Sequence, residues 1–401
     1  MRADTPRVAP DTPRAAPAPA PAALRPRRAF VTPPAPLLEA RITAPGKVAV
    51  APQAPLAAAP ARGAVIVEVD CVSLCGSDLA LFAGKYGGPR RDGLRFGHEW
   101  AGRVVATAPG SSFAVGQRVT GDCAAWCGSC DGCAFDRNLC RRLEKYGITI
   151  DGFAARRCEV SERHLYHDPY DLPPRLLALA EITAVAWRGV ARGLAVGALR
   201  AASTVGAGAL GVLTALVLHH HHGCAVRLIE RDAGRVALVR ERFPELTVEV
   251  PGDPSGAAPA QRAAGGTSWS ALYRGDGAPL VFECAGSVAG FDAALAIATP
   301  GGTVVTFGLP GPGVVDVRLV AAKRLAVFGS IGGTGAFPQA LAFLARHRET
   351  VTRLITHRFP LPRAEEAFRC AASDPERLKV QLTWREAAAA AAPERTGGEA
   401  R

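Results

Sequence analysis

The sequence has 401 residues, of which 48% are hydrophobic and 21% charged, so the chain can bury a sizeable core and is not disordered as a whole. This length exceeds one ordinary domain and fits two. No uninterrupted apolar run reaches the roughly 18–20 residues that a membrane helix needs, which argues against a membrane protein.

The net charge of +11 raises the question of nucleic-acid binding. The first 28 residues contribute +4 of this charge, from six arginines against two aspartates, and no basic run follows them. Aromatic residues make up only 6% of the chain, which leaves few platforms on which bases could stack. We therefore predict no nucleic-acid partner. The alternative function that is not enzymatic would be a zinc-stabilised nucleic-acid-binding protein.

Residues 1–27 are rich in proline, alanine and arginine, and the prolines block regular structure. We predict a disordered extension there, with order beginning near Arg28. The extension lacks the apolar stretch of a signal peptide, so we expect a cytoplasmic protein with reduced thiols. From residue 28 to 174, short alternating segments such as Ala64–Val72 predict a β-rich domain with little helix.

Strands and helices alternate from residue 175 to 322. The apolar segments that we predict as strands are Arg200–Val205, Cys224–Ile229, Pro279–Cys284 and Thr303–Phe307. This alternation indicates an α/β fold with a doubly wound parallel sheet. We expect residues 323–385, with a helix at Phe337–Arg346, to return to the first domain, and residues 386–401 to form a tail.

A first candidate metal site is a Cys-x2-Cys-x2-Cys-x6-Cys loop formed by Cys127, Cys130, Cys133 and Cys140. Four thiolates suit a tetrahedral zinc ion with no open position, which is a structural site. The alternative is four free cysteines that happen to lie close in the chain. The arginines that could offset the negative charge of such a site are Arg137, Arg141 and Arg142. Cys123 lies outside the pattern, and we do not expect it to be a ligand.

A second candidate site combines Cys75-Gly-Ser77-Asp78 with Gly97-His98-Glu99. A thiolate, an imidazole and a carboxylate are ligand types of a catalytic zinc that keeps one position for substrate. Taken alone, His98 is an ordinary hydrogen-bonded histidine and Cys75 a small buried residue. Because they occur together, upstream of a four-cysteine loop, they indicate a metal centre.

The run Gly206-Ala-Gly208-Ala-Leu-Gly211 lies between a predicted strand and a predicted helix. Its glycines allow a tight turn and the close approach of a pyrophosphate to backbone N–H groups. Glu230 ends the next predicted strand, where a carboxylate receives the ribose hydroxyls of a dinucleotide. This acid would repel a 2′-phosphate, which favours NAD, whereas Arg231 beside it keeps NADP possible.

These motifs occur in the order found in the zinc-dependent medium-chain alcohol dehydrogenase superfamily, which the chain resembles from Arg28 to Trp384. The segments Gly301–Val305 and Leu354–Pro360 extend the likeness. The resemblance implies a GroES-like catalytic domain beside a Rossmann domain, with the active site in the cleft between them. It also implies two zinc ions per chain, NAD or NADP as cofactor, and a homo-oligomer of two or four chains.

The resemblance further implies roles for single residues. Cys75 and His98 match the catalytic zinc ligands of the family. Glu99 matches a carboxylate that is a ligand in polyol dehydrogenases and lies outside the ligand set or binds only intermittently in other relatives. The residue that matches the third protein ligand of the polyol and threonine branch is Glu181. Ser77 matches the hydroxyl that takes the substrate proton, and Asp78 matches the carboxylate that orients the zinc-bound histidine.

Several positions depart from the family pattern, and one lysine allows two interpretations. Ile182 stands where the polyol branch usually has proline, and Ala80 stands where many relatives have a histidine that passes the proton to solvent. The family's cysteine loop usually has seven residues before its last cysteine, and this loop has six. Lys379 matches a basic residue near the cofactor pyrophosphate, although it also fits a solvated surface lysine.

Short runs narrow the resemblance to the polyol branch. The segments Cys75–Leu79, Gly97–Gly102 and Gly121-Asp122 resemble the 2-deoxy-scyllo-inosamine dehydrogenases. We therefore expect an enzyme that transfers hydride from a secondary alcohol, a polyol or aminocyclitol, to NAD(P). The alternatives within the superfamily are a threonine or a sugar-phosphate dehydrogenase. The cations shortly after the Cys75–Asp78 motif that could serve an anionic substrate are Lys85, Arg90 and Arg91.

Overall fold

A computed structural model of the chain describes residues 37–195, 201–251, 277–309, 311–384 and 394–395. The predicted disordered extension, the expected start of order at Arg28 and nearly all of the predicted tail lie outside these residues. Among the helices described, none is long and apolar enough to cross a bilayer.

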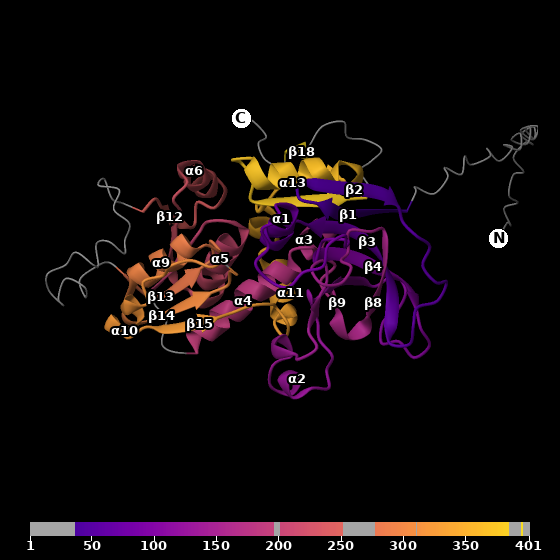
Figure 1. The fold of residues 1–401 in the computed structure, drawn as a ribbon, viewed down its shortest axis with the longest axis horizontal. Coiled ribbons are helices and arrows are strands. Elements are labelled where there is room, and N and C mark those ends of the chain that lie inside the picture. Colours follow the sequence, from indigo (N-terminus) through magenta and orange to yellow (C-terminus); the bar gives the residue numbers. More distant parts are fainter. Residues whose placement is uncertain (1–36, 196–200, 252–276, 310, 385–393, 396–401) are drawn as a thin grey trace, which may run out of the picture. The chain divides into compact units, whose positions relative to one another are not determined.

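Six parallel strands form one sheet in the order β12-β11-β10-β13-β14-β15 (Figure 1). Their bounds are β10 (Ala201–Val205), β11 (Ala225–Ile229), β12 (Thr247–Glu249), β13 (Ala278–Glu283), β14 (Ala298–Thr306) and β15 (Ala326–Gly329). The strand order reverses between β10 and β13, and the carboxyl ends at such a reversal form the crevice of a dinucleotide-binding fold. The predicted doubly wound sheet is confirmed, and it continues to β15, past the residue 322 at which we ended this domain.

Helices flank this sheet because their apolar faces pack against the strands. They are α4 (Ala180–Leu194), α5 (Ala209–His222), α6 (Ala233–Arg242), α9 (Val288–Ile297) and α10 (Arg318–Ala322). In α5, every residue of the segment 211–218 is buried. The helix stops at Gly223, whose φ of 61° lies in the left-handed region that glycine adopts without strain. The glycine-rich run connects the carboxyl end of β10 to the start of α5.

The second large sheet runs in the order β18-β16-β17-β3-β4-β5-β9, with β8 also paired to β3. Its strands are β3 (Ala64–Ser73), β4 (Glu99–Thr107), β5 (Arg118–Gly121), β8 (Arg157–Ser161), β9 (Leu165–His167), β16 (Ile355–Pro360), β17 (Lys379–Thr383) and β18 (Glu394–Arg395). Strand β17 pairs antiparallel with β3, with Gln381 opposite Ser73. The C-terminal segment therefore lies beside the strand that leads into the Cys75 motif.

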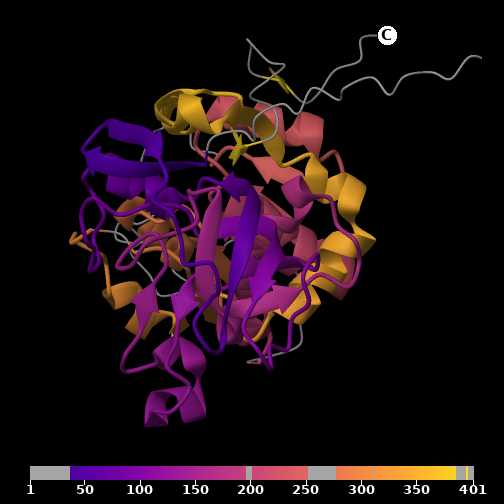
Figure 2. The same cartoon turned by 90° about the vertical axis from the view of Figure 1, so that its right-hand side faces the viewer.

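Shorter elements complete this half of the described chain. They are the hairpin β1 (Leu38–Ala44) and β2 (Lys47–Pro52), the pair β6 (Ala124–Ala125) and β7 (Glu144–Lys145), the helices α1 (Gly76–Phe82), α2 (Asp131–Phe135), α3 (Pro174–Leu177), α11 (Phe337–Arg346), α12 (Arg348–Thr352) and α13 (Ala364–Ser373), and the 3-10 turns η1 (Arg137–Leu139), η2 (Glu162–His164) and η3 (Leu361–Arg363). The loop that carries α2 extends away from both sheets (Figures 1 and 2). It is the loop that contains the four-cysteine motif.

Candidate active site and metal centres

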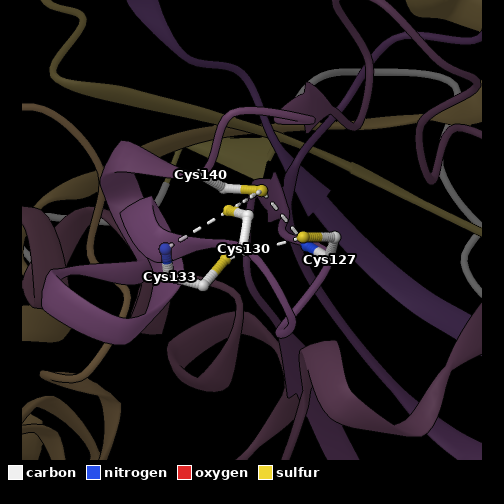
Figure 3. Close-up of side chains that lie close together, drawn as sticks. All are labelled: Cys127, Cys130, Cys133 and Cys140. Carbon is white, nitrogen blue, oxygen red and sulfur yellow. Dashed lines mark hydrogen bonds between the residues drawn. The ribbon is translucent and has the colours of Figure 1, made fainter.

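The loop between β6 and β7 brings four sulfur atoms together, those of Cys127, Cys130, Cys133 and Cys140 (Figure 3). The Sγ atoms of Cys127 and Cys133 are 3.9 Å apart, and so are those of Cys130 and Cys140. A zinc tetrahedron with Zn–S bonds of ~2.3 Å has S–S edges of ~3.8 Å. The six-residue spacing before the last cysteine is therefore compatible with a closed zinc site.

Backbone N–H groups point at these sulfurs, as in sites that hold thiolates. The Arg141 N–H donates to Cys130 Sγ over 3.4 Å. Hydrogen bonding from the Ser129 backbone lowers the pKa of Cys127 to about 5, and backbone N–H groups likewise lower the pKa of Cys130. Desolvation instead raises the pKa of Cys133 to about 11. Since a metal ion would hold all four sulfurs as thiolates, the donor set fits zinc.

The three arginines expected to offset the charge of this site act differently. Arg142 hydrogen-bonds to Cys127, which raises the pKa of its guanidinium. Arg141 reaches a sulfur through its backbone, and its side chain pairs with Asp131. The guanidinium of Arg137 lies 4.3 Å from the centroid of the Trp126 ring. Of the three, Arg142 is the one whose guanidinium bonds to a sulfur, while the charge of Arg141 also acts on Cys130.

The second candidate centre is assembled from segments further apart in the chain. Cys75, His98 and Glu99 offer ligand atoms that all lie within 4.8 Å of one another. The β3–β4 ladder produces this arrangement, because Ser73 pairs with Glu99 and Cys75 follows Ser73 at the start of α1. The structure therefore brings together the trio that the sequence indicated.

Asp78 organises this centre from a fully buried position. Its carboxylate accepts hydrogen bonds from the backbone N–H groups of Cys75 (2.9 Å) and Gly97 (3.2 Å). Asp78 Oδ1 also lies 3.8 Å from His98 Nδ1, while Nε2 of the same ring lies 3.4 Å from Ser77 Oγ. Histidines that bind metal commonly turn their other ring nitrogen toward a carboxylate in this way. The geometry thus leaves His98 Nε2 facing the centre.

Glu181 enters the same region from α4, although it lies outside the trio's cluster. It is 5% exposed, and burial raises the pKa of its carboxyl to about 8. Burial likewise raises the pKa of the Cys75 thiol to about 12 and raises the pKa of Glu99. Because these raised values come from burial and mutual repulsion of negative groups, a divalent cation among them would favour their charged forms. The donor set of sulfur, nitrogen and oxygen fits a catalytic zinc.

Lys379 has a partner that the sequence did not reveal. Its Nζ lies 2.7 Å from the carboxylate of Glu99 and donates to the carbonyl oxygen of Leu74 over 3.1 Å. The alternative that Lys379 is a solvated surface lysine is wrong, because the residue is 3% exposed and lies on a wholly buried strand. No local signal could have shown the ion pair, since its two members are 280 positions apart. Its predicted contact with a pyrophosphate stays a prediction.

A cavity of about 580 Å³ lies between this centre and the glycine-rich run. Its lining includes residues of the candidate centre, namely Cys75, Ser77, His98, Glu181 and Lys379. Its lining also includes residues at or near the glycine turn, namely Gly208, Ala209, Arg235, Cys284, Gly286 and Phe307. The candidate catalytic residues and the candidate dinucleotide turn therefore face one shared space.

The three glycines of the turn have different reasons to be glycine. Gly206 has a φ of 96°, and a Cβ on Gly211 would lie 1.9 Å from the carbonyl oxygen of Gly206. A Cβ on Gly208 would meet nothing within 4 Å. The backbone thus requires Gly206 and Gly211, whereas the open space at Gly208, the N-cap of α5, suits a pyrophosphate at a helix N-terminus.

The acid predicted to bind ribose lies beside this turn. Glu230 Oε2 accepts a hydrogen bond from the Ala207 N–H over 3.0 Å. Arg231 is not among the described residues that line the cavity, whereas Arg235 is. Burial lowers the pKa of Arg235. The sequence missed Arg235 because one arginine among many on a helix carries no distinguishing signal.

The sequence motifs also failed to indicate several other residues that line the cavity. Those that the motifs did not indicate include Tyr86, Asn138 and Lys145, and Cys123 lines the cavity although it is no member of the four-cysteine cluster. Of the three cations that could serve an anionic substrate, Lys85 lines the cavity and Arg90 pairs with Asp92 at 3.6 Å.

Comparison with known proteins places the chain in a family. Residues 61–170 match the Alcohol dehydrogenase GroES-like domain family, and residues 209–346 match the Zinc-binding dehydrogenase family. D-altritol 5-dehydrogenase of Agrobacterium fabrum (strain C58) is 30% identical to the chain, over 80% of this chain and 92% of its own length. L-threonine 3-dehydrogenase of Bacillus subtilis (strain 168) is 26% identical, over 76% of this chain and 86% of its own length.

A solved structure agrees with these matches. A protein of Sinorhizobium meliloti 1021, described as a zinc-binding dehydrogenase bound to NADP, is similar with a TM-score of 0.72 and 27% identity, covering 86% of this chain and 99% of that one. The chain therefore belongs to the zinc-dependent medium-chain alcohol dehydrogenase superfamily and is an NAD(P)-linked alcohol oxidoreductase.

Proposed function

We propose that the enzyme oxidises a secondary alcohol of a polyol or aminocyclitol, such as 2-deoxy-scyllo-inosamine, to the ketone. The observation that carries this proposal is that Cys75, Ser77 and His98 line the same cavity as Gly208. The polyol class is supported by the relative that acts on D-altritol. We also propose that the enzyme is a cytoplasmic homo-oligomer, as its cysteine usage and the resemblance suggest.

In this proposal, Cys75, His98 and Glu181 hold the catalytic zinc, with Glu99 beside them, and the four-cysteine loop holds a structural zinc. When bound, zinc supplies Lewis acidity, which lowers the pKa of a bound water to about 7, and NAD(P) supplies the hydride acceptor. Asp78 keeps His98 in orientation, because its carboxylate faces the ring nitrogen on the far side.

The protein's own part in proton transfer falls to Ser77. Its Oγ lies 3.4 Å from His98 Nε2 and lines the cavity, so it can accept the proton of a substrate hydroxyl placed at the centre. The methyl side chain at Ala80 offers no imidazole to pass that proton on. We infer that the proton leaves through water in the cavity or through a ribose or substrate hydroxyl.

The cofactor preference depends on two residues of opposite charge near the turn. Glu230 faces Ala207 at the turn and disfavours a 2′-phosphate, whereas Arg235 lines the cavity as a cation. We propose NAD as the preferred cofactor, because the carboxylate is the group at the turn itself. A ratio of kcat/KM for NAD over NADP above one supports this preference.

A second candidate has a specific observation in its favour. Lys85 and Lys145 both line the cavity, and two ammonium groups there would bind a phosphate or carboxylate on the substrate. A sugar phosphate or threonine would then replace the neutral polyol.

The test is zinc quantification combined with NADH and NADPH formation against a panel of polyols, aminocyclitols, sugar phosphates and threonine. The proposal expects two zinc ions per chain in the predicted centres and the highest kcat/KM with a polyol or aminocyclitol. A substrate preference that vanishes when the phosphate or carboxylate is removed would instead favour the second candidate.

A further inference from the structure

Three potential ligands lie together outside both centres described above. His357 on β16, Cys370 in the last turn of α13 and Asp374 directly after α13 offer atoms that all lie within 4.8 Å of one another. None of the three lines the cavity between the candidate centre and the glycine turn. We infer that His357, Cys370 and Asp374 form a third divalent-cation site, suited to zinc.

The distances among these atoms come close to those of a tetrahedral zinc site. Asp374 Oδ2 lies 3.6 Å from His357 Nε2 and 3.9 Å from Cys370 Sγ. Zinc bonds of ~2.0–2.3 Å to oxygen, nitrogen and sulfur give edges of ~3.3–3.6 Å in a tetrahedron. Shifts of a few tenths of an ångström would therefore bring the trio to bonding geometry, and the fourth position would take water.

Hydrogen bonding fixes which nitrogen of His357 faces the trio. The Thr356 hydroxyl donates to the carbonyl oxygen of Lys379 over 3.3 Å and accepts from the N–H of Leu378 over 3.0 Å. Its oxygen also lies 3.0 Å from His357 Nδ1. We assign the hydroxyl hydrogen to the Lys379 carbonyl, and in this assignment Nδ1 carries a proton and donates it to the Thr356 oxygen.

This arrangement leaves His357 Nε2 facing the thiol and the carboxylate. In a neutral ring with its proton on Nδ1, Nε2 presents a lone pair toward Asp374 Oδ2, 3.6 Å away, and a positive charge between the two atoms would stabilise this arrangement. A metal ion supplies that charge, and metal-bound histidines commonly donate their other N–H as His357 does. The rival account is a doubly protonated imidazolium that pairs with Asp374.

The surroundings also suit a cation. Cys370 and Asp374 are four positions apart, so the helix end presents them on one face. The carboxyl end of α13, a ten-residue helix, carries the negative end of the helix dipole. The His357 side chain is 6% exposed and that of Asp374 is 28% exposed, which gives a metal ion access from solvent. Sulfur and nitrogen ligands favour zinc over magnesium or calcium.

The experiment uses the full chain with its two predicted zinc centres filled, and cobalt chloride as the probe. We expect the wild type to bind one further cobalt ion, with the charge-transfer absorption of a cobalt–thiolate bond, and added zinc to displace it. Cys370→Ser should abolish the absorption, and both Cys370→Ser and Asp374→Asn should weaken cobalt binding by about 10-fold or more. Circular dichroism and thermal melting check that each variant is folded.

Two control variants separate this site from other sources of binding. Cys224→Ser removes a buried cysteine that belongs to none of the ligand clusters among the described residues, and His221→Ala/His222→Ala disrupts the histidine run at the end of α5. Both should keep the additional cobalt ion and its absorption. The inference is overturned if the folded wild type binds no additional ion, if Cys370→Ser and Asp374→Asn bind it as the wild type does, or if the histidine-run variant alone loses it.

Discussion

The four-cysteine loop and the Cys75–His98–Glu99 centre use similar ligand types but are built in opposite ways. The loop takes all of its ligands from one segment between β6 and β7, held by nearby backbone N–H groups. The other centre takes Cys75 from the start of α1, His98 and Glu99 from the start of β4, and further residues from α4 and β17, so it exists only when these distant segments are packed together. In the proposed function, the loop therefore stabilises the fold locally, whereas the second centre depends on the packing of distant segments and is the proposed catalytic centre.

The largest effect should come from removing a ligand of the loop. Cys130→Ser leaves three thiolates repelling one another without a complete site, and structural zinc contributes about 10–16 kcal/mol in small peptides. We expect one zinc ion to be lost and the midpoint of denaturant unfolding to fall sharply. The matched control is Cys224→Ser, which should change the midpoint little, and equal effects of both substitutions would remove the distinction between ligand and packing cysteines.

The catalytic centre should respond in activity rather than stability. Cys75→Ala removes the thiolate donor, and because Lewis-acid stabilisation is worth several kcal/mol, kcat/KM should fall by about 10³-fold or more. Zinc content should drop by one ion per chain while thermal melting stays near that of the wild type. Retention of full activity would show that the assignment of Cys75 is wrong.

The ion pair beneath this centre gives a third test. Lys379→Met leaves Glu99 buried without its partner, and breaking one side of a buried ion pair typically costs about 3–5 kcal/mol. We expect denaturant unfolding to show this loss, and the double variant Glu99→Gln/Lys379→Met to recover much of it. If the double variant is no more stable than Lys379→Met alone, the two residues are not energetically coupled.

A pH-dependent effect is expected at Asp122, which lies between the two centres in sequence. Burial raises the pKa of its carboxyl to about 6 from an unfolded value of 3.8. Between these pH values the folded state therefore binds more protons than the unfolded state. The contribution of this carboxyl to the free energy of unfolding is fully present below pH 3.8 and is lost as the pH rises through about 6.

Asp122→Asn lacks that loss, so its free energy of unfolding relative to the wild type should rise by about 2–3 kcal/mol from pH 4 to pH 8. Denaturant titrations at both pH values measure this difference. An unchanged difference would mean that the Asp122 carboxyl titrates normally in the folded protein.

The smallest expected effect is on dinucleotide binding, and it distinguishes Gly208 from Gly211 in the glycine turn. Gly208→Ala places a Cβ in open space, so the fold should survive while KM for the dinucleotide rises about 10-fold, equivalent to about 1.4 kcal/mol. Gly211→Ala places its Cβ 1.9 Å from the Gly206 carbonyl oxygen, so thermal melting should show loss of stability. Similar KM values for Gly208→Ala and the wild type would place the dinucleotide elsewhere.

The sequence predicted the parts of the molecule whose determinants are local. The strand and helix alternation around β10 to β14, the glycine turn and the four-cysteine loop each depend on neighbours in the chain. The order of the motifs also grouped Cys75 with His98, and the Ser73–Glu99 register brings these two residues close together.

The rest depended on pairings between distant segments. Lys379 meets Glu99 only because β17 pairs with β3, and no pattern near either residue reveals that neighbour. Arg235 and Lys145 reach the cavity from elements that carry no motif. The trio of His357, Cys370 and Asp374 likewise joins a helix end to a strand, so its members look like unrelated core and surface residues in the sequence.

The central claim is that one cation is shared by Cys75 and His98 on the side of the cavity that faces the glycine turn. A crystal structure of the zinc- and NAD-loaded enzyme, with anomalous data at the zinc edge, measures this directly. We predict a zinc peak at bonding distance, ~2.0–2.3 Å, from Cys75 Sγ and His98 Nε2, with the dinucleotide phosphates at Gly208. A map with a peak in the four-cysteine loop but none between Cys75 and His98 would contradict the account.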